Sequence, residues 1–383
     1  MLRRLRLFID NEWVESSSER FATNFNPSCG EAIAETPLCT RAEVLAAVQA
    51  AHRAFPAWRE TPAQQRVQVL FQFKQLLDTN LHELASLLST EMGKTHEEAV
   101  GSIKRGIEIV EFACGIPTLL MGDALENVTP NIDITTFRQP LGVCVGIVPF
   151  NFPAMIPLWM FPIAIACGNT FVLKAATMVP QTAMYMMNLL VLAGLPKGVV
   201  NLITCGRESV QVLLEHADVK AISFVGSTST GLLIYHTAAR HGKRVQALTE
   251  AKNHCLVLPD CLLERSARGI VNAAFGCAGE RCMALPVVVA HEKIADELVS
   301  ELVKLAKQVR VGYADAAATD MGPLVSAEHR AGVVRYIEKG VAEGAQLLLD
   351  GRDIDVEGYP DGFYLGPTVF DRVSPDMVIG REE

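Results

Sequence analysis

From about residue 141 the sequence alternates between two patterns, and this alternation restricts the fold class more than any other feature. Four short apolar runs rich in β-branched residues are typical of buried strands: 143–148, 170–173, 199–203 and 221–225. Each run is followed by a stretch of helical character: 153–166, 180–193, 208–216 and 229–240. Short buried strands that alternate with helices predict a parallel α/β sheet. Such sheets bind ligands at the carboxyl ends of their strands, so we expect functional residues there.

The residues before this region predict strands and a long helix. Short apolar runs broken by turn residues predict strands between Phe8 and Pro37, and Thr61-Pro62 marks the start of a helix. Apolar residues then recur every three or four positions up to Gly93, which predicts one long helix with a single apolar face. The residues of this face are Leu70, Phe73, Leu77, Leu81, Leu84 and Leu88.

A second α/β unit begins near residue 247. We expect its helices over 263–276 and 294–309 and a strand over 287–290. A chain of 383 residues is long enough for two to three domains, each with its own core.

Composition and charge exclude several classes of protein. Hydrophobic residues make up 50% of the chain and charged residues 20%, a balance that excludes intrinsic disorder and collagen-like sequence. The net charge is −9 and no basic stripe occurs, so we expect no nucleic-acid partner. The charge-free run 140–173 is long enough to span a bilayer, but internal prolines interrupt it, so we expect no membrane partner.

The 10 cysteines are scattered, without a CxxC pair or a cluster at zinc-ligand spacing. We therefore expect reduced thiols in the cytoplasm and no metal site. The basic, apolar start Met1–Leu7 lacks the features of a signal peptide but leaves a mitochondrial matrix location open.

Two polar features follow expected strands and suit a phosphate or ribose ligand. The segment Gly226–Gly231 opens a helix, and backbone N–H groups at a helix N-terminus favour anions. It is neither a Walker A loop nor a GxGxxG motif, and a tight strand-to-helix turn is the alternative. Lys174 ends a strand and suits a phosphate or a ribose hydroxyl, with a solvated lysine as the alternative.

Two other residues suit covalent catalysis at a carbonyl carbon. Cys282 follows Arg281, and a flanking cation lowers the pKa of a thiol, whose thiolate is the nucleophile. Asn151 lies in the turn after the first strand of the alternating region, where its amide suits a developing oxyanion. An inert buried cysteine and a turn-forming asparagine are the alternatives.

Taken together, the motifs resemble the aldehyde dehydrogenase superfamily from Phe8 to the last residue. The ordered set is Pro149-Phe-Asn-Phe-Pro153, Lys174, Phe224-Val-Gly-Ser227, Gly279-Glu-Arg-Cys282 and Gly366-Pro-Thr-Val-Phe370. Within the superfamily the chain looks closest to the CoA-acylating methylmalonate-semialdehyde dehydrogenases. The stretches that carry this closer resemblance are Arg105–Glu108, Trp159–Pro162, Ala251–His254 and Gly279–Ala284.

The resemblance implies an α/β fold with a Rossmann-type parallel-sheet NAD-binding domain over 1–120 and 139–246. It also implies that 121–138 is part of a β-arm for oligomerisation and that 247–383 is a second α/β, catalytic domain, incomplete at its C-terminus. The implied activity is NAD-dependent oxidation of malonate or methylmalonate semialdehyde with release of CO2. The acyl group would pass to CoA, giving acetyl-CoA or propionyl-CoA, so a small aldehyde and CoA are the expected partners.

The same resemblance implies a role for each matched residue. Cys282 is the nucleophile, and Asn151 and the Cys282 backbone N–H hold the oxyanion. Arg105 and Arg281 bind the substrate carboxylate, which forked guanidinium groups suit. An ion pair with Glu108 on the same helix is the alternative for Arg105. The residues implied for NAD binding are Pro149, Phe150, Lys174, Gly226, Ser227 and Glu383.

The sequence departs from the family pattern near the catalytic base. In hydrolytic relatives a glutamate activates water, and the residue in its place is Ala247 or Leu248, depending on the alignment. Neither can act as a base, and loss of a general base costs roughly 10²–10⁴ in rate, so the resemblance favours CoA over water. Glu250, a few residues on, is the alternative base, and it stands with Thr249 where the family has two glycines.

A second departure affects cofactor binding. The glutamate that binds the adenosine ribose in the family is Thr177 here, which leaves the choice between NAD and NADP open.

The third departure is the end of the chain. Glu383 aligns with a family glutamate that contacts the nicotinamide ribose, so we expect a truncated member without the arm that pairs with another subunit. A hydrolytic aldehyde dehydrogenase and an inactive truncated fragment are the alternatives.

Overall fold

The computed structural model describes residues 2–383, which form two compact units. Among these residues, unit 1 comprises 2–24, 34–84 and 101–249, and unit 2 comprises 25–33, 85–100 and 250–383. Four elements have residues in both units: β3 (Phe21–Asn26), β4 (Glu31–Pro37), α3 (Leu81–Met92) and α4 (His96–Cys114). No helix within the described residues is long and apolar enough to cross a membrane.

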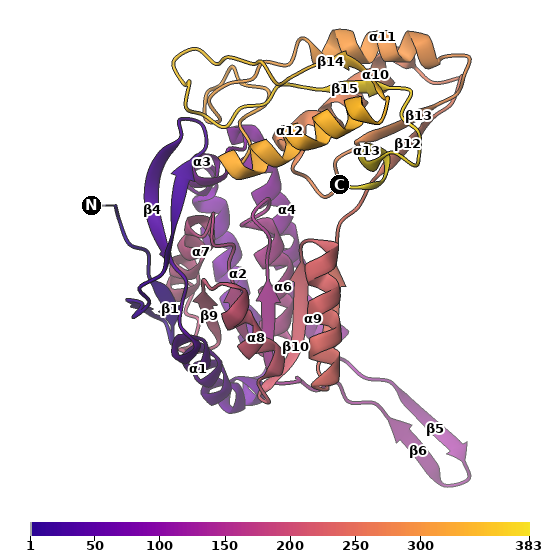
Figure 1. The fold of residues 1–383 in the computed structure, drawn as a ribbon. Helices are drawn as coiled ribbons and strands as arrows, with labels where there is room; N and C mark the ends of the chain where they lie inside the picture. Colours follow the sequence, from indigo (N-terminus) through magenta and orange to yellow (C-terminus); the bar gives the residue numbers. More distant parts are fainter. Residues whose placement is uncertain (1) are drawn as a thin grey trace. The chain divides into compact units, whose positions relative to one another are not determined.

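Unit 1 is built on a seven-stranded sheet with the order β11-β10-β7-β8-β9-β1-β2 (Figure 1). The strands from β11 to β9 are parallel, and β1 and β2 add antiparallel at one edge. Their bounds are β1 (Leu7–Ile9), β2 (Glu12–Val14), β7 (Val143–Ile147), β8 (Thr170–Lys174), β9 (Val200–Ile203), β10 (Val219–Val225) and β11 (Arg244–Leu248). The predicted parallel α/β sheet is therefore confirmed, and each expected strand lies within two residues of its observed bounds.

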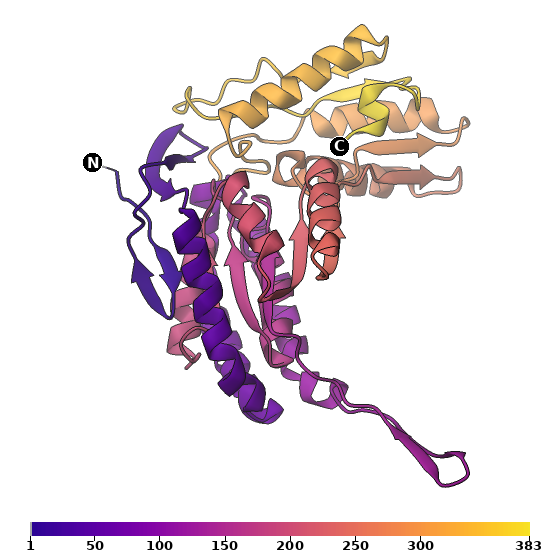
Figure 2. The ribbon, with the colours of Figure 1, turned by 60° about the horizontal axis from the view of Figure 1, so that its bottom comes forward.

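Helices cover both faces of this sheet (Figure 2). On one face, side chains of α1 (Arg41–Glu60), α8 (Arg207–Glu215) and α9 (Thr228–Arg240) join the strands in one apolar core. On the other, α6 (Met155–Ala166) contacts β7 and β8, and α2 (Ala63–Thr79) contacts α6 and α7 (Gln181–Leu192). The strands β7 and β8 are thus buried on both faces, which explains why their sequences are continuously apolar.

The expected long helix is interrupted at Asn80, so that prediction is wrong in one respect. Helix α2 ends at Thr79 and α3 begins at Leu81. The Asn80 side chain donates a hydrogen bond to the Leu76 carbonyl (2.7 Å) and accepts one from the Tyr185 hydroxyl (3.1 Å). A side chain that bonds to the backbone in this way competes with helix continuation. The apolar face itself is buried as expected.

A two-stranded hairpin of unit 1, β5 (Ala124–Thr129) and β6 (Ile132–Thr135), extends away from the sheet (Figure 1). Both strands are exposed throughout. The short helix α5 (Ile116–Leu119) precedes the hairpin.

Unit 2 contains two small sheets, each with its own apolar core. Parallel β12 (His254–Val257) and β13 (Val287–Ala290) pack with α10 (Leu263–Phe275) and α11 (Ala295–Ala306). Antiparallel β14 (Gln346–Leu349) and β15 (Val369–Asp371) accompany α12 (Ala327–Ala342) and the short α13 (Val378–Arg381). The predicted helices and strand of this region are confirmed, with α11 ending three residues earlier than expected.

Candidate active site

Cys282 follows a tightly folded loop in unit 2. After α10 the chain makes a single 3₁₀ turn, Gly276–Gly279, in which Cys277 and Ala278 have φ angles of 55° and 51°. Residues with a side chain rarely adopt this left-handed conformation, so contacts around the loop must hold it there. One such contact is internal, because the Glu280 N–H donates to the Cys277 carbonyl at 2.9 Å.

The side chain of Asn253 fixes the backbone on either side of Met283. Its side-chain amide donates to the carbonyl oxygens of Cys282 (3.0 Å) and Ala284 (2.7 Å). Sequence reasoning gave Asn253 no role, although it lies in the Ala251–His254 stretch that carries the family resemblance. Its function as a clamp depends on a contact 29 positions along the chain, which no local pattern shows.

The electrostatic surroundings of Cys282 differ from those expected. Burial raises the pKa of the Cys282 thiol, and the nearby Glu383 carboxylate raises it further, while Lys94 acts in the opposite direction. Arg281 was expected to lower this pKa, but its guanidinium is paired with Glu98 at 2.7 Å. A cation that is already neutralised by a carboxylate does little for a neighbouring thiolate, so this expectation was wrong.

The two arginines expected to bind a carboxylate have different environments. Arg281 in unit 2 is mostly buried, with 23% of its side chain exposed. Arg105 lies on α4 in unit 1 and is exposed. Within residues 2–383 Arg105 forms no salt bridge, so the alternative ion pair with Glu108 is absent from the described structure.

Two buried charged residues near Cys282 were not identified from the sequence. Lys94 is 1% exposed and Glu280 is 9% exposed. One carboxylate oxygen of Glu280 accepts a hydrogen bond from the Val325 N–H (3.2 Å) and lies 3.3 Å from the His329 Nε2. Burial raises the pKa of Glu280 to about 8 and lowers the pKa of Lys94. Burial of such groups is a property of the tertiary fold and leaves no signal in the sequence.

The expected cofactor residues of unit 1 lie at one edge of its sheet. Pro149, Phe150 and Asn151 follow β7, Lys174 is the last residue of β8, and Gly226-Ser227 follow β10. These three strands are adjacent and parallel, so their carboxyl ends meet at the same edge. The structure therefore brings this group of residues together within unit 1.

This edge fits a dinucleotide. Helix α9 begins after Ser227, whose own side chain makes no capping hydrogen bond, and the N-terminus of a helix suits a pyrophosphate. Lys174 is half-buried, and burial of its amine lowers the pKa of this group. The neighbours that oppose this shift are the thiols Cys39 and Cys205.

The substitution at Thr177 is also visible in the structure. Its carbonyl accepts a hydrogen bond from the Asn24 side chain at 2.8 Å. The hydroxyl of Thr177 cannot reproduce the charge of the family's glutamate, so the ribose contact expected of that glutamate has no equivalent at this position.

The residues in place of the family's catalytic base lie at the end of β11. Ala247 pairs with Phe224 in the sheet, and the Leu248 carbonyl accepts the Gly226 N–H at 3.1 Å. Neither side chain is titratable. Thr249 occupies the space beside Gly231, where an added Cβ would come within 2.4 Å of the threonine methyl group.

Glu383 lies close to Cys282 and is bound to the backbone of unit 2. Its carboxylate accepts a hydrogen bond from the Ala251 N–H at 3.0 Å. Burial raises the pKa of Glu383, and Lys252 opposes this shift. The exposed Glu250 lies close enough to raise the pKa of Glu383 further, so two acidic side chains gather here.

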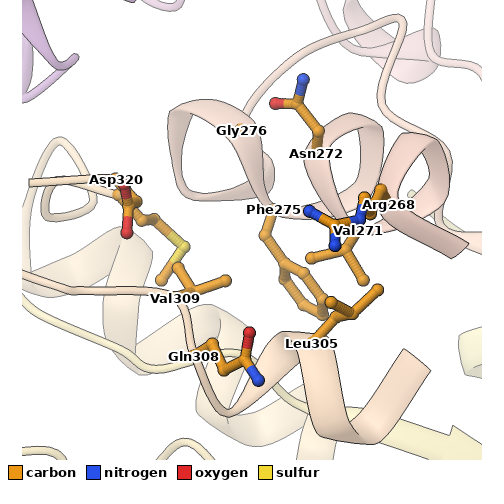
Figure 3. A pocket seen from close by; sticks show the side chains of 10 residues that line it. Arg268, Val271, Asn272, Phe275, Gly276, Leu305, Gln308, Val309 and Asp320 are labelled. Atoms are coloured by element: carbon orange, nitrogen blue, oxygen red, sulfur yellow. The ribbon is translucent and has the colours of Figure 1, made fainter. Parts of the chain in front are cut away.

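A cavity of about 210 Å³ lies elsewhere in unit 2, between α10 and the end of α11 (Figure 3). Arg268, Asn272 and Phe275 line one side, and Leu305 and Gln308 line the other. Cys282, the candidate nucleophile, is not among its lining residues.

Known proteins are similar to this chain in both sequence and fold. The sequence model of the aldehyde dehydrogenase family matches residues 13–383. Malonate-semialdehyde dehydrogenase 1 of Geobacillus thermodenitrificans is 50% identical over 383 residues, which cover 100% of this chain and 79% of that protein. The malonate-semialdehyde dehydrogenase of Pseudomonas aeruginosa is 49% identical over 380 residues, or 99% of this chain and 76% of that protein.

Solved structures agree with the sequence comparison. The methylmalonate-semialdehyde dehydrogenase of Oceanimonas doudoroffii superposes with a TM-score of 0.97 at 43% identity, covering 100% of this chain and 78% of that one. A Sinorhizobium meliloti protein assigned as a methylmalonate-semialdehyde dehydrogenase, and complexed with NAD, has a TM-score of 0.97 at 42% identity. The match covers 99% of this chain and 78% of the Sinorhizobium meliloti chain. With the motif order, the sheet topology and the family match in agreement, the chain belongs to the aldehyde dehydrogenase family.

Proposed function

We propose that this chain carries out NAD-dependent oxidation of malonate or methylmalonate semialdehyde, with loss of CO2 and transfer of the acyl group to CoA. The observation that carries this proposal is the identity of about half of all residues, along the whole chain, to malonate-semialdehyde dehydrogenases. The products would be acetyl-CoA and propionyl-CoA. The 10 cysteines are free thiols, which supports a reducing compartment such as the cytoplasm.

In this proposal Cys282 is the nucleophile. Its thiolate attacks the aldehyde carbon, and the Cys282 backbone N–H and the Asn151 amide donate hydrogen bonds to the oxyanion that forms. Because burial raises the pKa of the Cys282 thiol, a base must remove its proton before attack. Arg281 and Arg105 bind the carboxylate that distinguishes a semialdehyde acid from a simple aldehyde.

The cofactor edge of unit 1 is proposed to hold NAD. The N-terminus of α9 after Gly226-Ser227 would bind the pyrophosphate, and Lys174 would bind a ribose hydroxyl. Pro149 and Phe150 would line the nicotinamide side, and Glu383 would bind the nicotinamide ribose. When bound, NAD supplies the hydride acceptor for the oxidation.

The acyl group on Cys282 is then released by CoA rather than by water. Ala247 and Leu248 cannot deprotonate a water molecule, so the thioester persists until a stronger nucleophile arrives. The thiol of CoA attacks the thioester carbonyl, forms the new thioester and returns the Cys282 thiol.

NADH formation from malonate semialdehyde by the purified chain, with and without CoA, tests the proposal. We expect turnover that requires CoA and acetyl-CoA as the product. Turnover without CoA that yields the free acid would replace the proposal by a hydrolytic activity, and Glu250→Gln would then show whether Glu250 is its base. A folded sample that forms no NADH under either condition would overturn the proposed activity of this chain.

A further inference from the structure

Glu98 has a side chain held rigidly by its own helix. It lies in the first turn of α4, where its N–H donates a hydrogen bond to the Thr95 hydroxyl oxygen at 3.3 Å. In return, the Thr95 N–H donates to the Glu98 Oε2 at 3.2 Å. This reciprocal pair is a capping box, which fixes both the start of the helix and the direction of the carboxylate. Only 14% of the Glu98 side chain is exposed.

The second carboxylate oxygen of Glu98 reaches the loop that precedes Cys282. Its Oε1 accepts hydrogen bonds from the Cys277 N–H at 2.6 Å and from the Arg281 Nη2 at 2.7 Å. Bonds of this length to an ionised acceptor are among the strong ones in proteins. One oxygen atom therefore holds both the left-handed part of the loop and the guanidinium next to the nucleophile.

The guanidinium of Arg281 is also restricted by the backbone at Gly276. It lies directly over Gly276, and a Cβ built there would be 2.5 Å from the guanidinium carbon. With one Nη2 bond taken by Glu98 and one face covered by the backbone, the plane of the fork is fixed. Arginine has five N–H donors, so others remain for a ligand.

We propose that Glu98 is a positioning residue that makes the site selective for aldehydes carrying a carboxylate. It aims the remaining N–H donors of Arg281 at the substrate carboxylate and holds the loop that presents Cys282. This inference rests on the proposed role of Arg281 in the function above. Glu98 itself does not touch the substrate; it acts through Arg281.

Alkylation of Cys282 measures this selectivity without cofactor or turnover. Iodoacetate carries a carboxylate and iodoacetamide is its neutral counterpart, and the thiolate displaces iodide from either to form a thioether. Mass spectrometry of the Cys282 peptide gives the two rates. Their ratio, iodoacetate over iodoacetamide, reports recognition of the carboxylate and cancels changes in thiol reactivity.

We expect Glu98→Ala to lower this ratio by about tenfold, the effect of losing one oriented charge-assisted hydrogen bond. Glu98→Gln keeps an acceptor for both the Cys277 N–H and Arg281, so it should restore most of the ratio. Glu97→Ala is the matched control, because Glu97 is the exposed neighbour on the same helical turn. Its ratio should equal that of the unmodified chain.

The outcomes separate this inference from the proposed function. If Arg281→Ala lowers the ratio but a folded Glu98→Ala does not, the positioning role is overturned and the carboxylate role of Arg281 stands. If Arg281→Ala leaves the ratio unchanged, the carboxylate assignment itself fails, and the inference fails with it. Equal losses with both reagents in Glu98→Ala would show a structural role only. Should Glu98→Ala not fold, Glu98→Asp keeps the charge and shortens its reach, and an unchanged ratio there also overturns the proposal.

Discussion

Two buried ionisable side chains lie close to Cys282. The free-energy cost of burying their charges determines how the stability of the protein responds to pH. Lys94 and Glu280 are buried, and each favours its neutral form because a buried charge loses its hydration. Lys94 favours ionisation of Glu280, yet burial outweighs this attraction and raises the pKa of Glu280 to about 8. His329 beside it has a lowered pKa, again through burial. At neutral pH the Glu280 carboxyl therefore holds its proton.

Replacing Glu280 by glutamine should make the protein less sensitive to alkaline pH. Between the ordinary carboxyl pKa of 4.5 and about 8, the unfolded chain has lost the proton that the folded chain keeps. The free energy of unfolding must then fall as pH rises, by at most about 1.4 kcal/mol per pH unit for this group. We expect Glu280→Gln to unfold at a higher temperature than the unmodified chain at pH 9, and the difference to be smaller at pH 5.

Thermal unfolding followed by circular dichroism at the two pH values measures this difference. Glu328→Gln is the control, since Glu328 is an exposed acid on the neighbouring helix α12. A stability difference that is the same at both pH values would show that Glu280 titrates normally.

Motifs indicated the candidate site residues, whereas contacts between distant residues left no pattern in the sequence. Cys282, Asn151 and Lys174 were chosen because each residue type occurs at a place that suits its chemistry. The partnership of Glu98 with Arg281 joins positions 183 apart, and the fold alone brings them together. The same reason explains why the sequence predicted a lowered pKa for Cys282: it showed the arginine but not the carboxylate that neutralises it.

At the level of elements, the alternating apolar runs predicted the strands of unit 1 because β7, β8 and β9 are buried almost throughout, while β10 buries alternate residues. The order of the strands and the antiparallel addition of β1 and β2 depend on long-range pairing, for which one sequence carries no direct signal. The sequence did not predict the break at Asn80, because the heptad-like apolar face continues through it. The side chain that interrupts the helix is polar and is not one of the apolar residues of that face.

The loop between α10 and Cys282 depends on space at Gly276 rather than on its conformational freedom. The φ and ψ angles of Gly276 are −54° and 138°, which any residue can adopt. An added methyl group would instead collide with the Arg281 guanidinium. We expect Gly276→Ala to displace this group and to lower the ratio of Cys282 alkylation by iodoacetate and iodoacetamide by about tenfold, because small misplacements of a binding group are costly.

Gly269→Ala, in the helix α10 that precedes this loop, provides the control. A Cβ at Gly269 would meet nothing within 4 Å, so its alkylation ratio should not change. Since alanine favours helix over glycine, this control should also be slightly more stable, by about 1 kcal/mol. An unaffected ratio in Gly276→Ala would mean that Arg281 moves aside without losing its function.

On the scale of the whole molecule, each unit has an apolar core of its own, and the proposed cofactor residues before Glu383 belong to unit 1. A ligand that binds only the folded chain stabilises it, by about 2.7 kcal/mol at a hundredfold excess over Kd. We therefore expect NAD to raise the melting temperature and to slow amide hydrogen exchange at the carboxyl ends of β7, β8 and β10. These segments surround the bound dinucleotide in our proposal.

Lys174→Met tests whether the buried amine contributes to this binding. Methionine keeps most of the volume of the lysine and removes its charge, so the core around Cys39 and Cys205 stays filled while the contact with a ribose hydroxyl is lost. We expect a melting temperature close to that of the unmodified chain without NAD and a smaller increase when NAD is added. Lys197→Met is the control, because Lys197 is exposed and pairs with Glu12 at the surface. If Lys174→Met and the unmodified chain gained equal stability from NAD, Lys174 would serve the core of unit 1 and not the cofactor.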